Sequence, residues 1–429
     1  MNRLLALAIV AAVTFAVTFS VNYLTISVRF NGNDYRFETI EGKRIATDDK
    51  NIYIMEINRS LESTPIPHIR ANSWNLTLNE SLWVSNVLKC FNGNIYAAGV
   101  DVVKIRNSKV VWVKDLVAKR VSYKGTRENP IPVYYEDILN VFDMESDGKY
   151  LYLNTRDGIV KTDEDLNVIW AVELLRRSGN RFGDLNDDIS VSDGIYATRG
   201  NSVIKLNKNG ELEWAISLKS DEKVKVKVEI PKEKRKAAEK EGEKVPEFCE
   251  VEKYWVDLYA VYAEDYVYVV GLANERLNDQ DYPFLAKLSS DGEIVWARIV
   301  NVTYPTPGTY VLEGKIVRDK TTFIAWFSNC ILFMFDENGK ILNFYILNGE
   351  IGDVALTNDT IYIAALPIQI ERIEDRKPVI VEKREVKIKK IPAVSIPISI
   401  KAVKHELKVK RIECYSKNWE GGERMLIPV

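Results

Sequence analysis

The feature that most restricts the fold of this chain is a short recurring pattern: an apolar strand, a polar four-residue turn, and a second apolar strand that carries a large aromatic residue. The clearest copy spans residues 202–218, with its turn at 207–210 and its aromatic residue at Trp214. Five copies share this register, and a degenerate copy precedes them. The six aromatic residues are Trp74, Trp112, Trp170, Trp214, Trp296 and Phe344.

A second recurring strand lies upstream of each copy and is built round an aromatic residue with apolar neighbours. Seven such strands occur, at Tyr53, Tyr96, Tyr152, Tyr196, Tyr268, Phe323 and Tyr362. Each unit therefore predicts four short strands in roughly 40 residues, the pattern of a β-propeller blade. We expect an all-β propeller of seven four-stranded blades. The six aromatic residues are expected to dock blade against blade, and the last strand of the seventh unit is expected near Pro378.

The turn and its aromatic residue resemble the repeats of quinoprotein-type (PQQ-like) propellers, in which a turn Gly is followed by three residues and a Trp that docks between blades. The matching segments are residues 209–214, 291–296 and 338–344, the last with one extra residue. The resemblance covers about residues 43–382 and implies the propeller fold. Members that carry a cofactor usually have more blades, a central metal and a planar cofactor. No such constellation is identifiable here, so no cofactor is predicted.

Residues 1–24 are predicted to form an N-terminal hydrophobic helix. The run at 4–24 carries no charge and follows a short basic start, and a helix of this length covers roughly the 30 Å hydrocarbon core of a membrane. This pattern is typical of an export signal, and no good small-x-small cleavage site follows it. We therefore expect an extracellular, cell-surface protein with an uncleaved membrane anchor. A cleaved signal peptide and a secreted protein are the alternative.

Sequons and cysteines are compatible with export. Five Asn-x-Ser/Thr sequons are candidate glycosylation sites: Asn58, Asn75, Asn79, Asn301 and Asn358. Cys249 lies in an insertion and Cys414 in the tail, so a disulfide between them is one prediction, and four free thiols are the alternative. Only two Gln occur, whereas Lys, Glu, Ile, Val and Tyr are abundant. This composition is typical of heat-adapted proteins, and a thermophilic archaeon or bacterium is the expected source.

The propeller is assigned to residues 25–382, with insertions at 118–136 and 220–251, and residues 383–429 form a C-terminal β-rich extension. The hairpin-like start of the propeller is available to close the ring from the far end of the chain. Residues 379–412 alternate apolar and basic side chains, which indicates strands with a solvated charged face. The edges of those strands are alternatively templates for pairing with another protein.

Several kinds of chemistry find little support in the sequence. The net charge of −2 provides no field for nucleic acid, and no nucleic-acid partner is predicted. Acidic stretches at 143–148 and 184–188 mimic the start of a calcium loop but lack residues that the loop requires further on, and they are expected to be polar turns between blades. No nucleophile elbow, phosphate loop or dinucleotide fingerprint occurs. No catalytic, cofactor-binding or metal-ligating residue is assigned.

These observations predict a non-catalytic protein-interaction or assembly module at the cell surface. Its partner would be another protein or a further copy, contacted through the rim insertions or the C-terminal β edge. The alternative is an extracellular enzyme, either a polysaccharide hydrolase or lyase or a quinoprotein-like oxidoreductase, with its site at the propeller mouth. An enzyme should show convergent carboxylates there, whereas a scaffold should have a mouth filled by ordinary side chains.

Overall fold

The computed structural model describes residues 24–419, with gaps within that range. The gaps are residues 31–32, 49, 59–65, 80–81, 126–129, 177–187, 228–247, 303–312, 320, 329, 358–359, 368, 375–376 and 384–385. The regular structure between these gaps consists of strands, and no helix there has the length and apolar character needed to cross a membrane. The predicted hydrophobic helix of residues 1–24 lies outside the described residues, apart from Leu24, which opens a strand.

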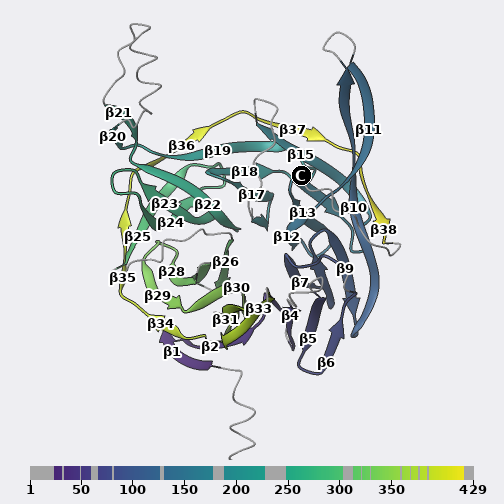
Figure 1. Ribbon diagram of the computed structural model, residues 1–429. Helices are drawn as coiled ribbons and strands as arrows, with labels where there is room; N and C mark the ends of the chain where they lie inside the picture. Colours follow the sequence, from purple (N-terminus) through teal and green to yellow (C-terminus); the bar gives the residue numbers. More distant parts are fainter. Residues whose placement is uncertain are drawn as a thin grey trace, which may run out of the picture.

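Seven blades are arranged in a ring (Figure 1), and their strands pair antiparallel except for one pair in blade 7. Blade 1 contains β3 (Arg44–Thr47), β4 (Ile52–Asn58), β5 (Ile66–Ala71) and β6 (Trp74–Thr77), and blade 2 contains β7 (Val87–Phe91), β8 (Asn94–Ala98), β9 (Asp101–Arg106) and β10 (Lys109–Gly125). Blade 3 contains β12 (Val141–Ser146), β13 (Leu151–Thr155), β14 (Gly158–Thr162) and β15 (Val168–Arg176). In each of them the first strand lines the channel and the fourth lies at the rim.

The next three blades follow the same plan. Blade 4 contains β16 (Ile189–Val191), β17 (Ile195–Arg199), β18 (Ser202–Leu206) and β19 (Leu212–Ser220), and blade 5 contains β22 (Tyr254–Ala263), β23 (Val267–Glu275), β24 (Gln280–Leu288) and β25 (Ile294–Val302). Blade 6 contains β26 (Gly314–Asp319), β27 (Thr322–Phe327), β28 (Ile331–Asp336) and β29 (Ile341–Leu347). The predicted all-β propeller of seven blades is confirmed.

Blade 7 is shared by the two ends of the chain, which closes the ring. It contains β30 (Gly349–Leu356) and β31 (Thr360–Pro367), followed by β2 (Asn33–Glu41) and β1 (Leu24–Phe30) from the N-terminal part. β2 pairs with β31 in parallel, with Phe37 opposite Ile361. The last strand of this unit was expected near Pro378, and that prediction is wrong. Pro378 lies in β33 (Lys377–Lys383), which forms a separate hairpin with β32 (Gln369–Glu374).

The C-terminal part of the chain adds a fifth strand to five blades, and we call these five strands the belt. They are β34 (Ile388–Lys390) on blade 6, β35 (Ala393–Pro397) on blade 5, β36 (Ile400–Lys404) on blade 4, β37 (Leu407–Arg411) on blade 3 and β38 (Cys414–Asn418) on blade 2. Figure 1 shows the belt in yellow around the outside of the ring. The prediction of four-stranded blades is therefore corrected, because an outer strand leaves unpaired backbone groups that a further strand can satisfy.

The core lies between neighbouring blades. Middle strands such as β13 and β18 are buried along their whole length, because both of their faces are covered by adjacent blades. One cluster, for example, joins Tyr196 and Val203 of blade 4 to Val269 and Phe284 of blade 5. A strand that is buried on both faces has apolar side chains at nearly every position. The sequence of these strands therefore lacks the strict alternation of apolar and polar residues that is typical of a half-exposed strand.

The recurring Trp residues lie at the contact between one blade and the next. The indole N–H of Trp214 in blade 4 donates to the carbonyl of Ser290 in the turn of blade 5, at 2.9 Å. Gly292 of that turn has φ +82°, and a Cβ there would meet the Trp214 ring at 3.3 Å. Glycine is therefore required both for the backbone conformation and for the approach of the ring. Trp170 and Trp296 make the same N–H contact with the turns of blades 4 and 6.

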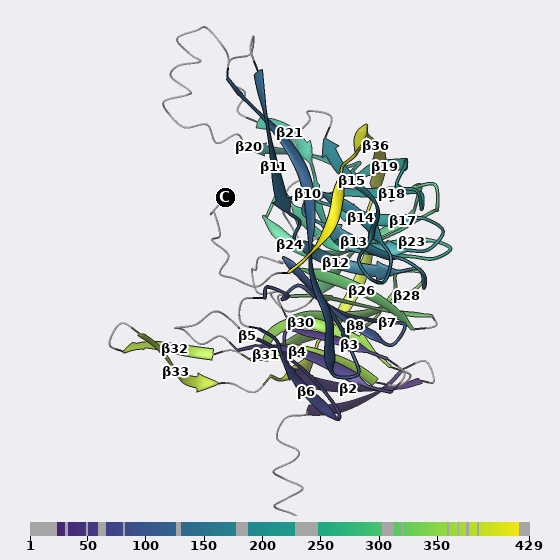
Figure 2. The ribbon, with the colours of Figure 1, turned by 90° about the vertical axis from the view of Figure 1, so that its right-hand side faces the viewer.

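The predicted insertions are hairpins that extend beyond the ring of blades (Figure 2). β10 continues past blade 2 and pairs with β11 (Pro130–Ile138) from Val117 to Gly125. We call this hairpin, residues 117–125 and 130–138, the arm. The second insertion contains β20 (Lys223–Lys227) paired with β21 (Phe248–Glu252).

Candidate functional site

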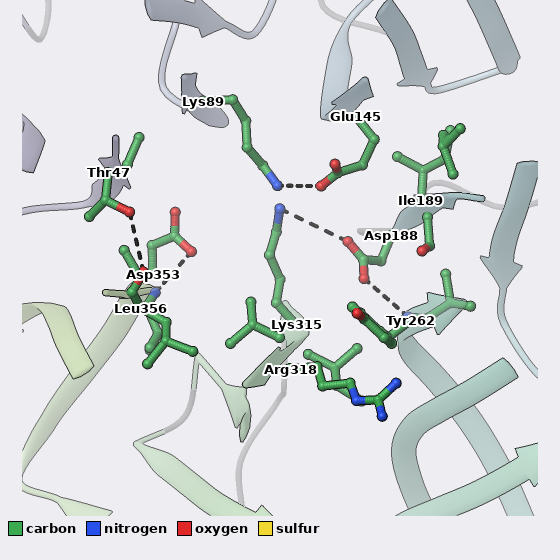
Figure 3. A pocket seen from close by; sticks show the side chains of 18 of the residues that line it. Thr47, Lys89, Glu145, Asp188, Ile189, Tyr262, Lys315, Arg318, Asp353 and Leu356 are labelled. Atoms are coloured by element: carbon green, nitrogen blue, oxygen red, sulfur yellow. Dashed lines mark hydrogen bonds and ion pairs between the residues drawn. The ribbon is translucent and has the colours of Figure 1, made fainter. Parts of the chain in front are cut away.

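The channel at the centre of the ring contains a cavity of about 510 Å³ that is lined by the first strand of every blade. Charged residues of six blades line it. Figure 3 labels Lys89, Glu145, Asp188, Lys315, Arg318 and Asp353, and Glu264 after β22 also lines the cavity. They come together because the first strands of all the blades surround the common axis.

Two lysines connect the acids of blades 3 and 4. Lys315 Nζ lies 2.6 Å from Asp143 Oδ1 and 3.9 Å from Asp188 Oδ1. Lys89 Nζ lies 2.6 Å from Glu145 Oε1 and 3.9 Å from Asp143 Oδ1. Asp188 also accepts the backbone N–H of Val261 in blade 5 at 3.0 Å. One continuous network of charges thus joins blades 2 to 6 across the channel.

The two aspartates respond to this network in opposite ways. Burial raises the pKa of Asp188 well above its usual range, and the adjacent charge of Asp143 raises it further. Burial alone would also raise the pKa of Asp143, but Lys315 and Lys89 hold it well below the ordinary value. Of the two carboxyls, Asp143 therefore ionises at the lower pH, beside the lysines, and Asp188 holds its proton to the higher pH.

Arg44 forms a second polar centre beside the cavity. Its guanidinium is buried and reaches three other blades. It donates to the carbonyls of Asn86 before blade 2 and Gly352 in blade 7, and it pairs with Glu313 before blade 6 at 2.7 Å. The carboxylate of Asp353 in blade 7 accepts a hydrogen bond from the backbone N–H of the next residue, Val354, at 2.9 Å. Arg44 therefore connects the first blade to the last across the point where the ring closes.

This arrangement is a network of paired charges. Glycoside hydrolysis needs two carboxyl groups that flank a scissile bond; Glu145, Asp188, Glu264 and Asp353 line the cavity, whereas Asp143 is 1 % exposed. In the described part of the chain, no group of three His, Cys, Asp or Glu side chains could hold a metal ion. What the geometry shows directly is that opposite charges from different blades meet at the axis, where they fix the blades relative to one another.

Isosteric variants of the two aspartates should have opposite effects on stability. At pH values between the ordinary Asp pKa of 3.8 and the raised pKa of Asp188 in the folded protein, the Asp188 carboxyl must take up a proton on folding. Wild type should therefore lose stability relative to Asp188→Asn as pH rises through this window, by up to about 1.4 kcal/mol per pH unit. The lowered pKa of Asp143 stabilises the protein above pH 3.8. Asp143→Asn should thus be destabilised at pH 7, by a deficit that shrinks as pH falls below 4.

Urea unfolding of the wild type and both variants between pH 3 and pH 8 measures these differences. The assignment of the proton to Asp188 is contradicted if both variants are destabilised equally at pH 7, or if Asp188→Asn loses stability with rising pH relative to wild type.

The residues singled out from the sequence lie away from this channel. The six aromatic residues Trp74, Trp112, Trp170, Trp214, Trp296 and Phe344 belong to the outer strands. Of the sequon residues, Asn75, Asn79 and Asn301 are exposed, whereas the side chains of Asn58 and Asn358 lie outside the described residues.

The predicted disulfide between Cys249 and Cys414 is not formed, because all four cysteines are free thiols. Cys249 pairs with Val226 in the β20–β21 hairpin, whereas Cys414 pairs with Ala118 in blade 2. The prediction assumed that an insertion and the tail would meet, but the belt carries Cys414 round the ring to another blade.

The sequence reasoning missed the channel residues Arg44, Lys89 and Lys315 and interpreted Asp143 and Asp188 only as parts of turns. The available signal was a single charged residue at the start of an apolar innermost strand, as in Lys315-Ile316-Val317 and Asp353-Val354-Ala355. That signal can be recognised only when the seven units are aligned on their first strand, because one position of that strand then carries a polar side chain in several blades.

No protein-family model and no curated protein sequence matches this chain. Among solved structures, BamB from Moraxella catarrhalis is 11 % identical, with 80 % of this chain and 96 % of that chain covered and a TM-score of 0.39. The WD40 β-propeller domain of Doa1 is 9 % identical, with 80 % and 94 % covered and a TM-score of 0.41. BBS1N, solved in complex with ARL6DN, is 11 % identical, with 86 % and 91 % covered and a TM-score of 0.43. Identities this low concern the fold alone, and the sheet topology of the chain makes it a seven-bladed β-propeller repeat protein.

Proposed function

We propose that this protein is an exported, non-catalytic β-propeller that binds a protein partner at the cell surface through the arm. The observation that carries the proposal is the concentration of exposed apolar side chains on this one hairpin. Six large apolar residues of the arm are each at least 40 % exposed: Val121, Tyr123, Ile131, Tyr134, Tyr135 and Ile138. The six residues are divided between the two faces of the hairpin, and exposed apolar side chains gathered on one element are typical of an interaction site.

The register of the arm gathers four apolar residues on one face. Val121 lies opposite Tyr134, and Tyr123 lies opposite Pro132, and residues directly opposite or two apart on a strand share a face. Tyr134 and Tyr123 are 79 % and 67 % exposed. Tyrosines offer a large contact area with few rotatable bonds, and they are common among the residues that dominate binding energy.

The base of the arm is held firmly against the propeller. Arg120 is 8 % exposed and pairs with two buried acids of blade 3, Glu173 at 2.7 Å and Asp157. Val117 and Ala118 pair with β11 and also with β38, so the belt lies along the opposite edge of β10. A rigid base keeps the Tyr-bearing face in place before binding, which reduces the entropy lost on association.

Export is supported by the uncharged apolar run at 4–24 and by the exposure of Asn75, Asn79 and Asn301. It is tested on intact cells by labelling with an amine reagent that does not cross membranes. A surface protein should be labelled before lysis to the same extent as after it. Labelling that requires lysis would place the protein inside the cell and overturn this part of the proposal.

The double variant Tyr123→Ser/Tyr134→Ser should abolish partner binding. A photo-crosslinking residue at position 134 first identifies the partner on intact source cells. Binding of the purified partner should then weaken roughly 700-fold in the double variant, since two central aromatic residues that each contribute about 2 kcal/mol together account for about 4 kcal/mol. Titration calorimetry measures the change.

The matched control is Tyr266→Ser/Leu277→Ser, which removes two exposed apolar side chains from blade 5, away from the arm. The control should bind as the wild type does. The proposed role of the arm fails if crosslinking from position 134 captures the same proteins as crosslinking from position 277. It also fails if both double variants bind the partner as the wild type does.

A further inference from the structure

The belt follows a strict seven-residue repeat. Between or after its strands stand five linker residues, spaced by seven positions: Ile391, Ile398, His405, Ile412 and Trp419. Each donates its backbone N–H to the outer strand of one blade. The acceptors are the carbonyls of Phe344, Ala297, Ala215, Ala171 and Val113, at 2.9 Å for the first and 3.1 Å for the other four. One seven-residue repeat therefore serves one blade.

The acceptor position is also constant within the blades. Ala297, Ala215, Ala171 and Val113 each directly follow the Trp of their own outer strand. The apolar residue two positions after a linker faces inward, as Ile400 and Leu407 do, and both are buried. The next residue is basic and exposed in these two repeats, namely Lys401 and Lys408. The shared pattern is an antiparallel strand that follows the linker residue, which is apolar in four of the five cases, with a small or apolar residue two positions later; Lys follows that residue in the repeats of blades 4 and 3.

Blade 1 has the same acceptor but no belt strand among the described residues. Its outer strand β6 begins with Trp74, so Asn75 takes the position of Ala297 in blade 5. The register agrees, because Trp74 lies opposite Ala71 of β5 as Trp296 lies opposite Lys287 of β24. Among the residues that the structure describes, β6 is the last strand of its sheet and pairs with β5. Asn75 and Thr77 therefore present backbone groups at an open edge.

The belt ends beside this edge. Trp419, its fifth linker residue, packs in the same apolar cluster as Trp74 and Leu76 of β6. The next repeat of the sequence would place Gly421 and Gly422 where the other repeats have Ile400-Lys401 and Leu407-Lys408. Two glycines weaken a strand and supply no side chain to bury. At these two positions the sequence after Trp419 thus lacks the apolar and basic pair that the repeats of blades 4 and 3 carry.

We propose that the open edge of β6 accepts a β-strand from a partner protein, one that carries the apolar and basic pattern of the belt repeat. This inference rests on the proposed function, since it gives the interaction module a second surface and names the class of segment that binds there. Main-chain hydrogen bonds to Asn75 and Thr77 supply the affinity, and contact with the apolar cluster that includes Trp74 and Trp419 favours the apolar residues. Five blades of the same molecule already show this mode of recognition.

The probe is a fluorescent peptide of residues 398–418 with Cys414 replaced by Ser, titrated into the full-length protein in detergent. We expect saturable binding at one site, and slower hydrogen exchange at the Asn75 and Thr77 amides when the peptide is bound. Asn75→Pro removes an outward N–H and should weaken binding at least roughly tenfold. The matched variant Asn75→Ala loses the same side-chain amide but keeps the N–H, and it should bind as the wild type does.

Three results would overturn the proposal. The first is no saturable binding at peptide concentrations up to about 1 mM. The second is equal binding by the Pro and Ala variants, without added protection of the Asn75 and Thr77 amides. The third is slow exchange of these amides in the free protein that becomes fast in a variant truncated after Trp419. That result would mean that the C-terminal residues of the chain itself occupy the edge. If Asn75→Pro does not fold, the exchange measurement on the wild type still decides.

The edge and the arm are tested separately. Tyr123→Ser/Tyr134→Ser should bind the belt peptide normally, because the arm lies on blade 2 and leaves β6 unchanged. If that variant loses partner binding but binds the peptide normally, both proposals stand. If the wild type binds the partner but not the peptide, only the proposal about the β6 edge fails.

Discussion

Replacing Arg44 with Met should lower the free energy of unfolding by about 3–5 kcal/mol. Arg44 pairs with Glu313 at 2.7 Å and donates to the carbonyls of Asn86 and Gly352. The substitution removes the donor to two carbonyls that meet the buried guanidinium and the counter-ion of Glu313, about a third of whose side chain is exposed, while the Met side chain still fills most of the space. Because the contacts join blade 1 to blades 2, 6 and 7, unfolding should become less cooperative as well. Chemical denaturation followed by Trp fluorescence measures both effects.

Arg70→Met in the same blade is the matched control. Arg70 forms an ion pair with Glu56 at 2.8 Å, but about a third of each side chain is exposed. Partly exposed pairs contribute about 0–1 kcal/mol, so Arg70→Met should change stability by no more than that. Equal losses in the two variants would show that Arg44 has no special role in closing the ring.

Replacing Arg120 with Met should cost a similar amount, about 3–5 kcal/mol, and should also loosen the arm. The buried carboxylates of Asp157 and Glu173 would lose their counter-ion. The triple variant Arg120→Met/Asp157→Asn/Glu173→Gln removes the charges together and should recover most of the lost stability. Denaturant unfolding measures the stability, and limited proteolysis of the arm measures its attachment.

Lys119→Met is the control for the adjacent position, since Lys119 pairs with Glu413 on the exposed surface. It should leave both stability and cleavage of the arm close to those of the wild type. If the triple variant is no more stable than Arg120→Met, the destabilisation comes from lost packing of the Arg side chain and not from unpaired charge.

The fold was largely predictable because its defining signal is repeated. Trp112, Trp170, Trp214 and Trp296 recur with the same turn, and repetition separates such a signal from chance. The position of the C-terminal strands was not predictable in the same way. The alternation around Ile400 and Leu407 indicates strands, but a strand pattern does not reveal which edge it pairs with, and these strands pair with segments about 180 to 300 residues away.

The channel was hidden for a different reason. Asp143, Asp188 and Lys315 are single residues that differ from blade to blade, and their meaning comes from convergence at the axis. A charge at one strand start looks like a turn residue, as Asp143 did. Only the closed ring brings it within 2.6 Å of a lysine that is 172 residues away in sequence.

The belt also sets an order of events along the chain. It visits blades 6, 5, 4, 3 and 2 in turn, so strands later in the belt bind blades that come earlier in the chain. The belt can pair only with outer strands that have already formed. It therefore attaches late in folding, to a ring of blades that is already assembled. A pull on the C-terminus would detach it one blade at a time, in five small steps, before any blade separates from its neighbour. Mechanical load at that end would thus be released as a series of short extensions while the ring stays closed.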